Sequence, residues 1–435
     1  MSEDNRRPDK TFTKEEIDSV KKGYDKNNDD ESMKHKLIYA LSEYPQVKEI
    51  PLTKEIKIKV LDTFENLKWL LSKFNAQIKY NLMTRRREIT IPGHHISPED
   101  LENESLMRVH YLSTLNDMPT KLLNEHLQTI AMRNSYHPIV DCVKSKIWDG
   151  VKRLDSFVET IKSNDQKLSN KLIRTWMTAA IAAAHSIDGF TNHGAIVLQG
   201  DQGIGKTAWV KSLDPINCGA IKDGAILDPS YKDCVIALSQ YWIVELGELD
   251  ATYKSADIAR IKSYITMKSD NIRNPYARLD QTRPRRTAYI ATVNKSNYLV
   301  DDTGNRRWWT IEALEINYQH NFDMQQVWAE VYHEWKGGSL TYLNSNLQSE
   351  VNQLNEEHEQ IDPLEEKLLS AFNWDTPLTK KMTVTEILEA IQWKPIDQKS
   401  ANKVSRLLTK ITGKKAIRNG KKGERMREVP ANFRV

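Results

Sequence analysis

Cysteine is scarce in this chain of 435 residues, which has three, at positions 142, 218 and 234. No two of them form a CxxC pair, and an odd number cannot pair completely. The sequence therefore argues against a zinc ribbon and a disulfide framework. Unpaired thiols are typical of a reducing compartment, so we expect a cytoplasmic protein.

Long apolar runs are also missing. No stretch of about 18 apolar residues occurs, so we expect neither a membrane-spanning helix nor a membrane partner. The first 33 residues contain no apolar core of the kind that a secretory signal requires, and their mixed charges predict a disordered arm.

The chain as a whole has no large excess of either charge, but its C-terminal segment is strongly basic. The sequence has 63 Lys and Arg against 59 Asp and Glu, a net charge of +4. Residues 380–435 hold 15 basic and 5 acidic residues, a local net charge of +10. This segment is a candidate for contact with nucleic acid, and a solvated basic tail is the alternative.

The hydrophobic pattern divides the chain into five parts. After the arm at 1–33, residues 34–150 mix helical and strand patterns and predict an α+β domain. Helical spacing covers "IKIKVLDTFENLKWLLSKFN", and two short strands flank a basic turn in "AQIKYNLMTRRREITIPG". Residues 151–345 alternate buried strands with helices, which predicts a mostly parallel α/β sheet.

The remaining two parts are a linker and a basic module. Residues 346–374 are polar and acidic and predict a helical linker. Residues 375–435 contain two short helices followed by two strands around "NGKKG", an order that resembles a winged helix.

The stretch "GDQGIGKT", from Gly200 to Thr207, matches the phosphate-binding pattern GxxxxGK[ST] in full. An apolar strand, "GAIVLQG", precedes it and a helix follows, as the mechanism requires. Backbone amides and the helix N-terminus would meet the phosphates, Lys206 would reach the β- and γ-phosphates, and Thr207 would ligate Mg²⁺. The predicted nucleotide-binding residues are Gly200, Asp201, Gln202, Gly203, Ile204, Gly205, Lys206, Thr207 and Ala208.

Two acidic residues follow the next buried strand, Tyr241 to Leu246. Glu245 ends the apolar run "WIV" and Glu248 lies three residues later. One carboxylate would hold Mg²⁺ together with Thr207, and the other would polarise the attacking water. We favour Glu245 for the metal, and the reverse assignment stays open.

Two further patterns complete a candidate catalytic site. Asn294 ends the strand "RTAYIATVN" and could sense the γ-phosphate or hold the attacking water. Arg306 and Arg307 follow a Thr-Gly-Asn turn, which suits an arginine finger acting on a neighbouring subunit. An arginine pair packed on Trp308 or Trp309 is the alternative.

The segment "MKSDNIRNPYARLDQTRPRR", between these motifs, has six basic residues and Tyr276. Basic residues with an aromatic on a loop are typical of contact with single-stranded nucleic acid, and a surface loop paired with carboxylates is the alternative.

Taken in order, "GDQGIGKT", "WIVELGELD", "IKSYITMKSDNIRNPYAR", "ATVN" and "DDTGNRRWW" resemble the virulence-associated protein E family. Its members are ATPases encoded by phages and genomic islands, and they are similar to superfamily-three helicases. The resemblance covers about residues 130–345. It implies an AAA+ core that assembles as a ring, usually a hexamer, in the cytoplasm of a bacterial host.

The resemblance also assigns roles to single residues. It implies that Gly200 to Thr207 is the Walker A loop, Glu245 the Walker B acid with Glu248 a second acid, and Asn294 sensor 1. Arg306 or Arg307 would be the arginine finger. The segment around Asn274 to Arg278 would be a hairpin that grips DNA, with Tyr276 and Arg278 in contact.

In the basic terminal module, the second helix would contact the duplex and the wing would contact phosphate. The candidate residues for DNA binding in this module are Lys399, Lys403, Arg406, Lys414, Lys415, Arg418, Lys421 and Lys422.

The sequence therefore predicts a ring-forming, ATP- and Mg²⁺-dependent DNA helicase that acts in replication of a phage or mobile element on single- and double-stranded DNA. Two alternatives stay open: an ATP-dependent remodeller or loader that does not unwind DNA, and a DNA-binding regulator or defence factor whose ATPase controls assembly.

Overall fold

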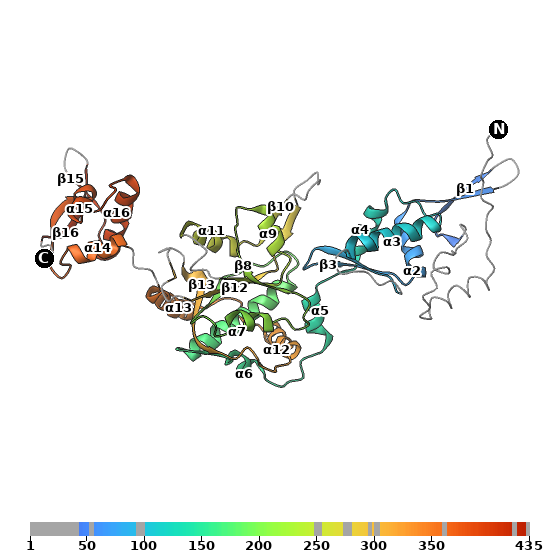
Figure 1. The fold of residues 1–435 in the computed structure, drawn as a ribbon, viewed down its shortest axis with the longest axis horizontal. Helices are drawn as coiled ribbons and strands as arrows, with labels where there is room; N and C mark the ends of the chain where they lie inside the picture. The colour runs from blue at the N-terminus through green and yellow to red at the C-terminus, as the bar shows by residue number, and fades with distance from the viewer. Residues whose placement is uncertain are drawn as a thin grey trace. The chain divides into compact units, whose positions relative to one another are not determined.

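The computed structural model describes residues 43–51, 56–92, 101–247, 255–272, 281–294, 298–299, 305–358, 363–419 and 424–431. The chain divides into two compact units (Figure 1). The first comprises residues 1–296 and 303–353, and the second comprises residues 297–302 and 354–435.

The first unit begins with an α+β part that has its own hydrophobic core, built around Leu67, Leu70 and Leu127. Its elements are β1 (Val47–Pro51), β2 (Ile56–Val60), α2 (Phe64–Lys73), β3 (Gln77–Asn81), β4 (Arg86–Thr90), α3 (Leu101–Leu115), α4 (Leu123–Arg133) and β5 (Ser135–Tyr136). β3 and β4 confirm the two strands predicted around the basic turn.

The helical spacing predicted for residues 56–75 was wrong for its first part. Residues 56–60 form β2, which pairs antiparallel with β1. The helix begins only at Phe64, where the side chain of Thr63 accepts a hydrogen bond from the backbone N–H of Asn66. This N-cap sets the start of α2, because it satisfies a backbone donor that the helix itself leaves unpaired. The sequence "IKIKV" alternates with the period of a strand.

A six-stranded sheet forms the centre of the first unit, in the order β6-β13-β7-β12-β9-β8. Five neighbouring strands are parallel and β6 alone is antiparallel, which confirms the predicted mostly parallel α/β sheet. The strands are β6 (Ile161–Ser163), β7 (Ala195–Gln199), β8 (Ile221–Ala225), β9 (Ile243–Leu246), β12 (Ala288–Val293) and β13 (Trp308–Ile316). Three of them, β7, β9 and β12, were predicted from their apolar runs, whereas β13 was not.

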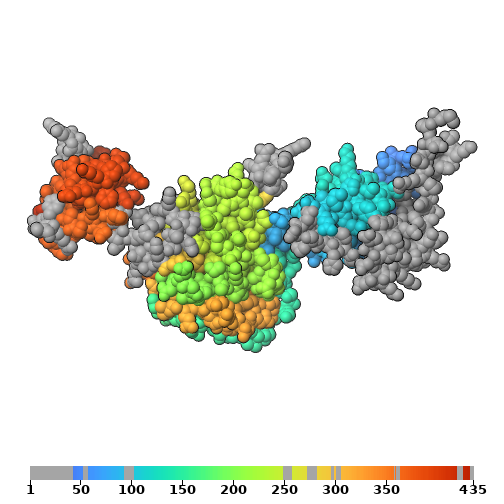
Figure 2. Space-filling view, viewed as in Figure 1, coloured from blue at the N-terminus to red at the C-terminus, as the bar shows by residue number. Residues whose placement is uncertain are grey.

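Helices cover the sheet and fix it by buried tryptophans. Trp176 on α7 donates a hydrogen bond to the carbonyl of Tyr289 on β12. Trp328 on α12 packs against Trp242 at a ring distance of 4.6 Å. α12 lies against α5, α6 and α7. Figure 2 shows its orange atoms beside teal atoms from earlier in the chain. The helices are α5 (Pro138–Ser145), α6 (Leu154–Val158), α7 (Gln166–His185), α8 (Lys206–Ser212), α9 (Lys232–Leu238), α11 (Ser255–Ile265) and α12 (Met324–Lys336).

An antiparallel hairpin of β10 (Ser269–Ile272) and β11 (Gln281–Pro284) follows α11. It forms the stem of the segment predicted to contact DNA. Tyr276 and Arg278 lie outside the described residues, as do Glu248, Lys421 and Lys422. Before β13, the short 3-10 helix η4 (Asn305–Arg307) carries the arginine pair.

The second unit has a separate core that includes Leu364, Phe372 and Leu408. Its elements are α14 (Pro363–Ala371), β14 (Leu378–Thr383), α15 (Val384–Ala390), α16 (Gln398–Thr412), β15 (Ile417–Asn419) and β16 (Glu424–Pro430). The sheet order is β14-β16-β15, all antiparallel. The sequence places α14 in the linker, but its buried leucines join this core. α13 (Ser345–Glu357) precedes it along the chain.

Among the described residues, no helix is long and apolar enough to cross a bilayer.

Candidate functional site

The glycine-rich loop lies between β7 and α8, at the carboxyl edge of the parallel strands. Gly203 and Gly205 have φ angles of 89° and 97°, in the region that favours glycine. A Cβ on Gly205 would also lie 2.3 Å from Cδ1 of Tyr318, and one on Gly200 would lie 2.3 Å from the carbonyl oxygen of Ala313. The backbone therefore requires glycine at both Gly200 and Gly205.

Lys206, the first residue of α8, turns its side chain back toward the loop. Its Nζ donates to the carbonyls of Gly200 at 2.7 Å and Asp201 at 2.8 Å, and to Oδ1 of Asn294 at 2.9 Å. The side chain is 8% exposed. These contacts fix the ammonium beside the loop and bring the end of β12 next to it.

Glu245 is fully buried in β9 and is held by three donors. Its Oε1 accepts from the hydroxyl of Thr207 at 2.6 Å and from that of Thr292 at 3.0 Å, and its Oε2 accepts from the N–H of Gly224 at 3.3 Å. Burying a carboxylate is costly unless its oxygens accept hydrogen bonds such as these. The structure thus joins two residues predicted as metal ligands, 38 positions apart, by a direct hydrogen bond.

The strand order explains why these residues meet. β12 lies between β7 and β9, with Val293 beside Gln199 and Ala291 beside Leu246. Asn294 therefore emerges next to the loop at the same edge of the sheet. Lys206 and Asn294 form one hydrogen-bonded pair, and Thr207 and Glu245 form a second. The two pairs are adjacent because Lys206 and Thr207 are consecutive residues of α8.

The donor set fits the groups that the sequence predicts. A threonine hydroxyl and a carboxylate are hard oxygen ligands of the kind that Mg²⁺ prefers. The ammonium of Lys206 and the amides of a left-handed glycine loop at a helix start suit phosphate oxygens. In the described part of the chain, no cluster of three or more His, Cys, Asp or Glu side chains could hold another metal ion.

The arginine pair lies at the other end of the parallel strands, where the strands begin. Trp308, which follows it, pairs with Ala195 at the start of β7, whereas the glycine-rich loop begins after the end of that strand. Five residues of strand separate Ala195 from Gly200, or about 17 Å at the usual rise. Arg306 is exposed and Arg307 is partly buried. Neither side chain can span this distance to the loop of the same chain.

The alternative interpretation was that the arginine pair packs on Trp308 or Trp309. Trp308 and Trp309 are both buried, and the indole of Trp309 lies against Gly194, where a Cβ would be 2.2 Å from Nε1. The carbonyl of Arg306 accepts a hydrogen bond from Nε2 of Gln348 on α13 at 3.2 Å.

Helix α16 presents the predicted basic residues of the second unit. Lys399, Lys403 and Arg406 are spaced by four and three positions and lie on one face, with Lys399 and Arg406 exposed. Lys415 and Arg418 are also exposed. Lys414 differs, because its Nζ forms an ion pair with Glu428 at 2.8 Å.

Sequence reasoning missed the residues that support the site. Thr292 and Gly224 hold Glu245, and Trp209 fixes α8 by donating to Oγ1 of Thr160 at 2.8 Å. Thr292 was detectable in principle, since it is a hydroxyl inside the otherwise apolar strand "YIATV".

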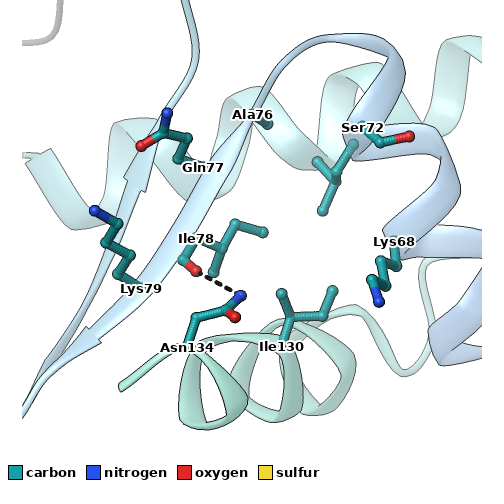
Figure 3. Close-up of a pocket in the computed structure, with 9 residues that line it drawn as sticks. Lys68, Ser72, Ala76, Gln77, Ile78, Lys79, Ile130 and Asn134 are labelled. Atoms are coloured by element: carbon teal, nitrogen blue, oxygen red, sulfur yellow. Dashed lines mark hydrogen bonds between the residues drawn. The ribbon is translucent and has the colours of Figure 1, made fainter. Parts of the chain in front are cut away.

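A separate pocket of ≈ 370 Å³ lies in the N-terminal part, formed by α2, β3 and α4 (Figure 3). Leu71, Ile78 and Ile130 form its apolar lining, and Asn134 donates to the carbonyl of Ile78. No carboxylate, imidazole or thiol lines it, and none of the predicted site residues belongs to it.

The sheet and the residues at its carboxyl edge define an α/β protein with a parallel-strand core. The chain belongs to the virulence-associated protein E-like domain family, whose model matches residues 143–360. This match confirms the family that the five motifs indicated.

Solved structures that match the chain include the A form apo structure of the NrS-1 C-terminal region (residues 305–718), at 15% identity and a TM-score of 0.44. That comparison covers 83% of this chain and 98% of the other. A second apo structure of the same region has 13% identity and a TM-score of 0.42, covering 84% and 98%. Among curated proteins, none matches the chain.

Proposed function

We propose that this protein is an ATP hydrolase of the AAA+ P-loop class that works on DNA. The observation that carries the proposal is the pair of hydrogen bonds from consecutive residues of α8. Lys206 binds Asn294 and Thr207 binds Glu245, so a phosphate ligand, a sensor, a metal ligand and an acid converge at one edge of the sheet.

The residues have distinct roles in this proposal. Lys206 exchanges its carbonyl contacts for the β- and γ-phosphates, which are stronger acceptors because they are charged. Thr207 and Glu245 hold Mg²⁺, which supplies neutralisation of the charge that develops on the phosphates. Asn294, released by the movement of Lys206, orients the attacking water or senses the γ-phosphate. Glu248 is the proposed base.

The position of the arginine pair supports an oligomer. Because Arg306 and Arg307 lie about 17 Å of strand from their own loop, they serve hydrolysis only in a neighbouring subunit. A closed ring, with six subunits in the family that the motifs resemble, gives every site such a neighbour.

Two elements support DNA as the substrate. The β10–β11 stem presents the basic segment that contains Tyr276 and Arg278. The order α14, β14, α15, α16, β15, β16 supports a winged helix, whose second helix carries the exposed Lys399 and Arg406. We propose that the ring is a helicase in replication of a phage or mobile element.

Strand displacement tests the proposal directly. The wild-type protein should hydrolyse ATP faster with single-stranded DNA and should displace a labelled strand. Lys206→Ala should abolish both activities while duplex binding remains. Lys222→Ala, on the neighbouring strand β8, is the matched control and should retain both activities. ATP hydrolysis that ignores DNA, with no strand displaced, would instead support the remodeller or the regulator.

A further inference from the structure

Helix α11 contacts the base of the hairpin through Tyr264. The carbonyl of Tyr264 accepts a hydrogen bond from Arg285, and the guanidinium carbon of Arg285 lies 3.6 Å from the centre of the tyrosine ring. Arg285 also donates through Nε to Oδ2 of Asp270 at 2.8 Å. Arg285 and Asp270 are buried, at 3% and 8% exposure. Asp270 is in β10 and Arg285 directly follows β11, so this contact attaches the stem to α11.

The same helix contacts the arginine turn through Lys262. Its Nζ donates to Oδ1 of Asn305 at 2.7 Å, and the side chain is 2% exposed. Asn305 is the first residue of η4 and directly precedes Arg306 and Arg307. Burying an ammonium is costly unless it is bound, so this lysine is held at the turn.

The two contacts are made by Lys262 and Tyr264, which lie two residues apart on the same helix. Helix α11 therefore cannot move at Tyr264 without moving Lys262, because its backbone hydrogen bonds keep its residues in a fixed relation. The carbonyl of Arg306 in η4 also accepts a hydrogen bond from Gln348 of α13, in an exposed contact at 3.2 Å. A shift of the hairpin base would move α11 and, through Lys262, the arginine turn.

We infer that Lys262 is a positioning residue that connects the hairpin of each subunit to the arginine finger it offers its neighbour. The inference rests on the proposed function. DNA held by the hairpin would then set the finger position, and hence the rate of ATP hydrolysis in the next subunit. A change at the DNA contact of one subunit would therefore alter ATP hydrolysis in its neighbour.

Four variants and a control test this role: Lys262→Met, Asn305→Ala, their double mutant, Lys262→Arg, and Arg260→Met. Arg260 is an exposed cation on the same helix and forms a surface ion pair with Asp257 at 3.8 Å. ATP hydrolysis is measured with and without single-stranded DNA, as kcat and KM separately.

Lys262→Met and Asn305→Ala should each lower DNA-stimulated kcat by about tenfold with KM for ATP unchanged, because the ATP site of the same subunit is intact. The double mutant should have the same kcat as either single variant, since both substitutions remove the same hydrogen bond. Lys262→Arg should recover most of the loss, and Arg260→Met should behave as wild type.

Mixing subunits separates positioning from simple damage. Lys262→Met subunits keep their own ATP site, and Lys206→Ala subunits keep their finger, so a mixture should regain part of the activity that each lacks alone. If Lys262→Met instead raises KM and no mixture recovers, or if it matches Arg260→Met, the inference is wrong.

Two controls keep the outcome interpretable. Asn305→Ala carries the test if Lys262→Met fails to fold, because Asn305 lies on a partly exposed turn. Failure of the proposed function is distinct, since the wild-type protein would then show no DNA-stimulated hydrolysis to lose.

Discussion

At the scale of single residues, buried polar groups decide the chemistry and the pH response. Glu245 is an acid with three donors, whereas His137 is a buried base with none. Both ring nitrogens of His137 are buried and have no hydrogen-bond partner in the described part of the chain. Burial lowers the pKa of His137 to about 3, with the nearby Arg286 and His185 acting in the same direction.

Glu245→Gln should separate ATP binding from hydrolysis. The amide keeps the size of the side chain but loses the charge that is proposed to hold Mg²⁺, so kcat should fall at least about 100-fold while nucleotide affinity changes by less than about tenfold. Nucleotide titration and phosphate release measure the two. Asp223→Asn, a surface carboxylate paired with Lys211, is the control and should keep wild-type turnover. Near-normal hydrolysis by Glu245→Gln would remove it from the site.

Because of His137, we expect the stability of the fold to decrease at acid pH. Its pKa is lower in the folded than in the unfolded chain, so the unfolded state binds the proton first as the pH falls. Stability is then unaffected above about pH 6.5 and is lost progressively toward pH 3. At pH 5.5 the loss is about 1 kcal/mol.

His137→Phe should reduce this loss. The measurement compares urea unfolding midpoints at pH 7.5 and 5.5 for the wild-type protein and the variant. An equal pH-dependent shift in both proteins would show that another group causes the acid sensitivity.

At the scale of elements, Arg427 fixes β16 to α16 in the second unit. Its guanidinium donates to the hydroxyl of Thr409 at 2.9 Å, to the carbonyl of Ser405 at 2.7 Å and to that of Lys414 at 2.9 Å. This arginine therefore serves the fold, whereas the exposed cations of α16 are the ones proposed to contact DNA.

The double variant Lys399→Glu with Arg406→Glu should weaken binding to duplex DNA at least about tenfold and reduce the salt dependence by about two phosphate contacts. Lys367→Glu, an exposed cation on α14, is the matched control and should change the affinity little. Fluorescence anisotropy at several salt concentrations measures both. A variant with the wild-type salt slope would show that α16 does not face the phosphates.

At the scale of the whole molecule, the glycine-rich loop and the arginine pair lie at opposite ends of the parallel strands. If the pair serves as an arginine finger, as proposed, it must act on the loop of a second copy of the chain.

Arg306→Ala with Arg307→Ala should stop turnover yet spare ATP binding, because the loop is untouched. Mixing this variant with Lys206→Ala should restore part of the hydrolysis, since some neighbouring pairs then have an intact loop and an intact finger. Phosphate release across a series of mixing ratios is the measurement, and particle size with ATP reports assembly. No recovery at any ratio would contradict a finger acting between subunits.

Local patterns predicted much of this fold. The strands β7, β9 and β12 and the C-terminal hairpin are all present. They were predictable because apolar periodicity and glycine reflect local backbone preferences. β2 was misread because five alternating residues precede a helix without a break, and α14 was placed in the linker because its pattern does not show which core receives it.

The sequence by itself determined the family and the phosphate-loop pattern, since spacing along the chain and the conformational freedom of glycine suffice for both. Only the tertiary structure decided which side chains meet. The insertion of β12 between β7 and β9 places Asn294 at Lys206, and parallel register places the arginines at the far edge. The link from Lys262 to Asn305 spans 43 residues and depends on how α11 packs, which no local pattern encodes.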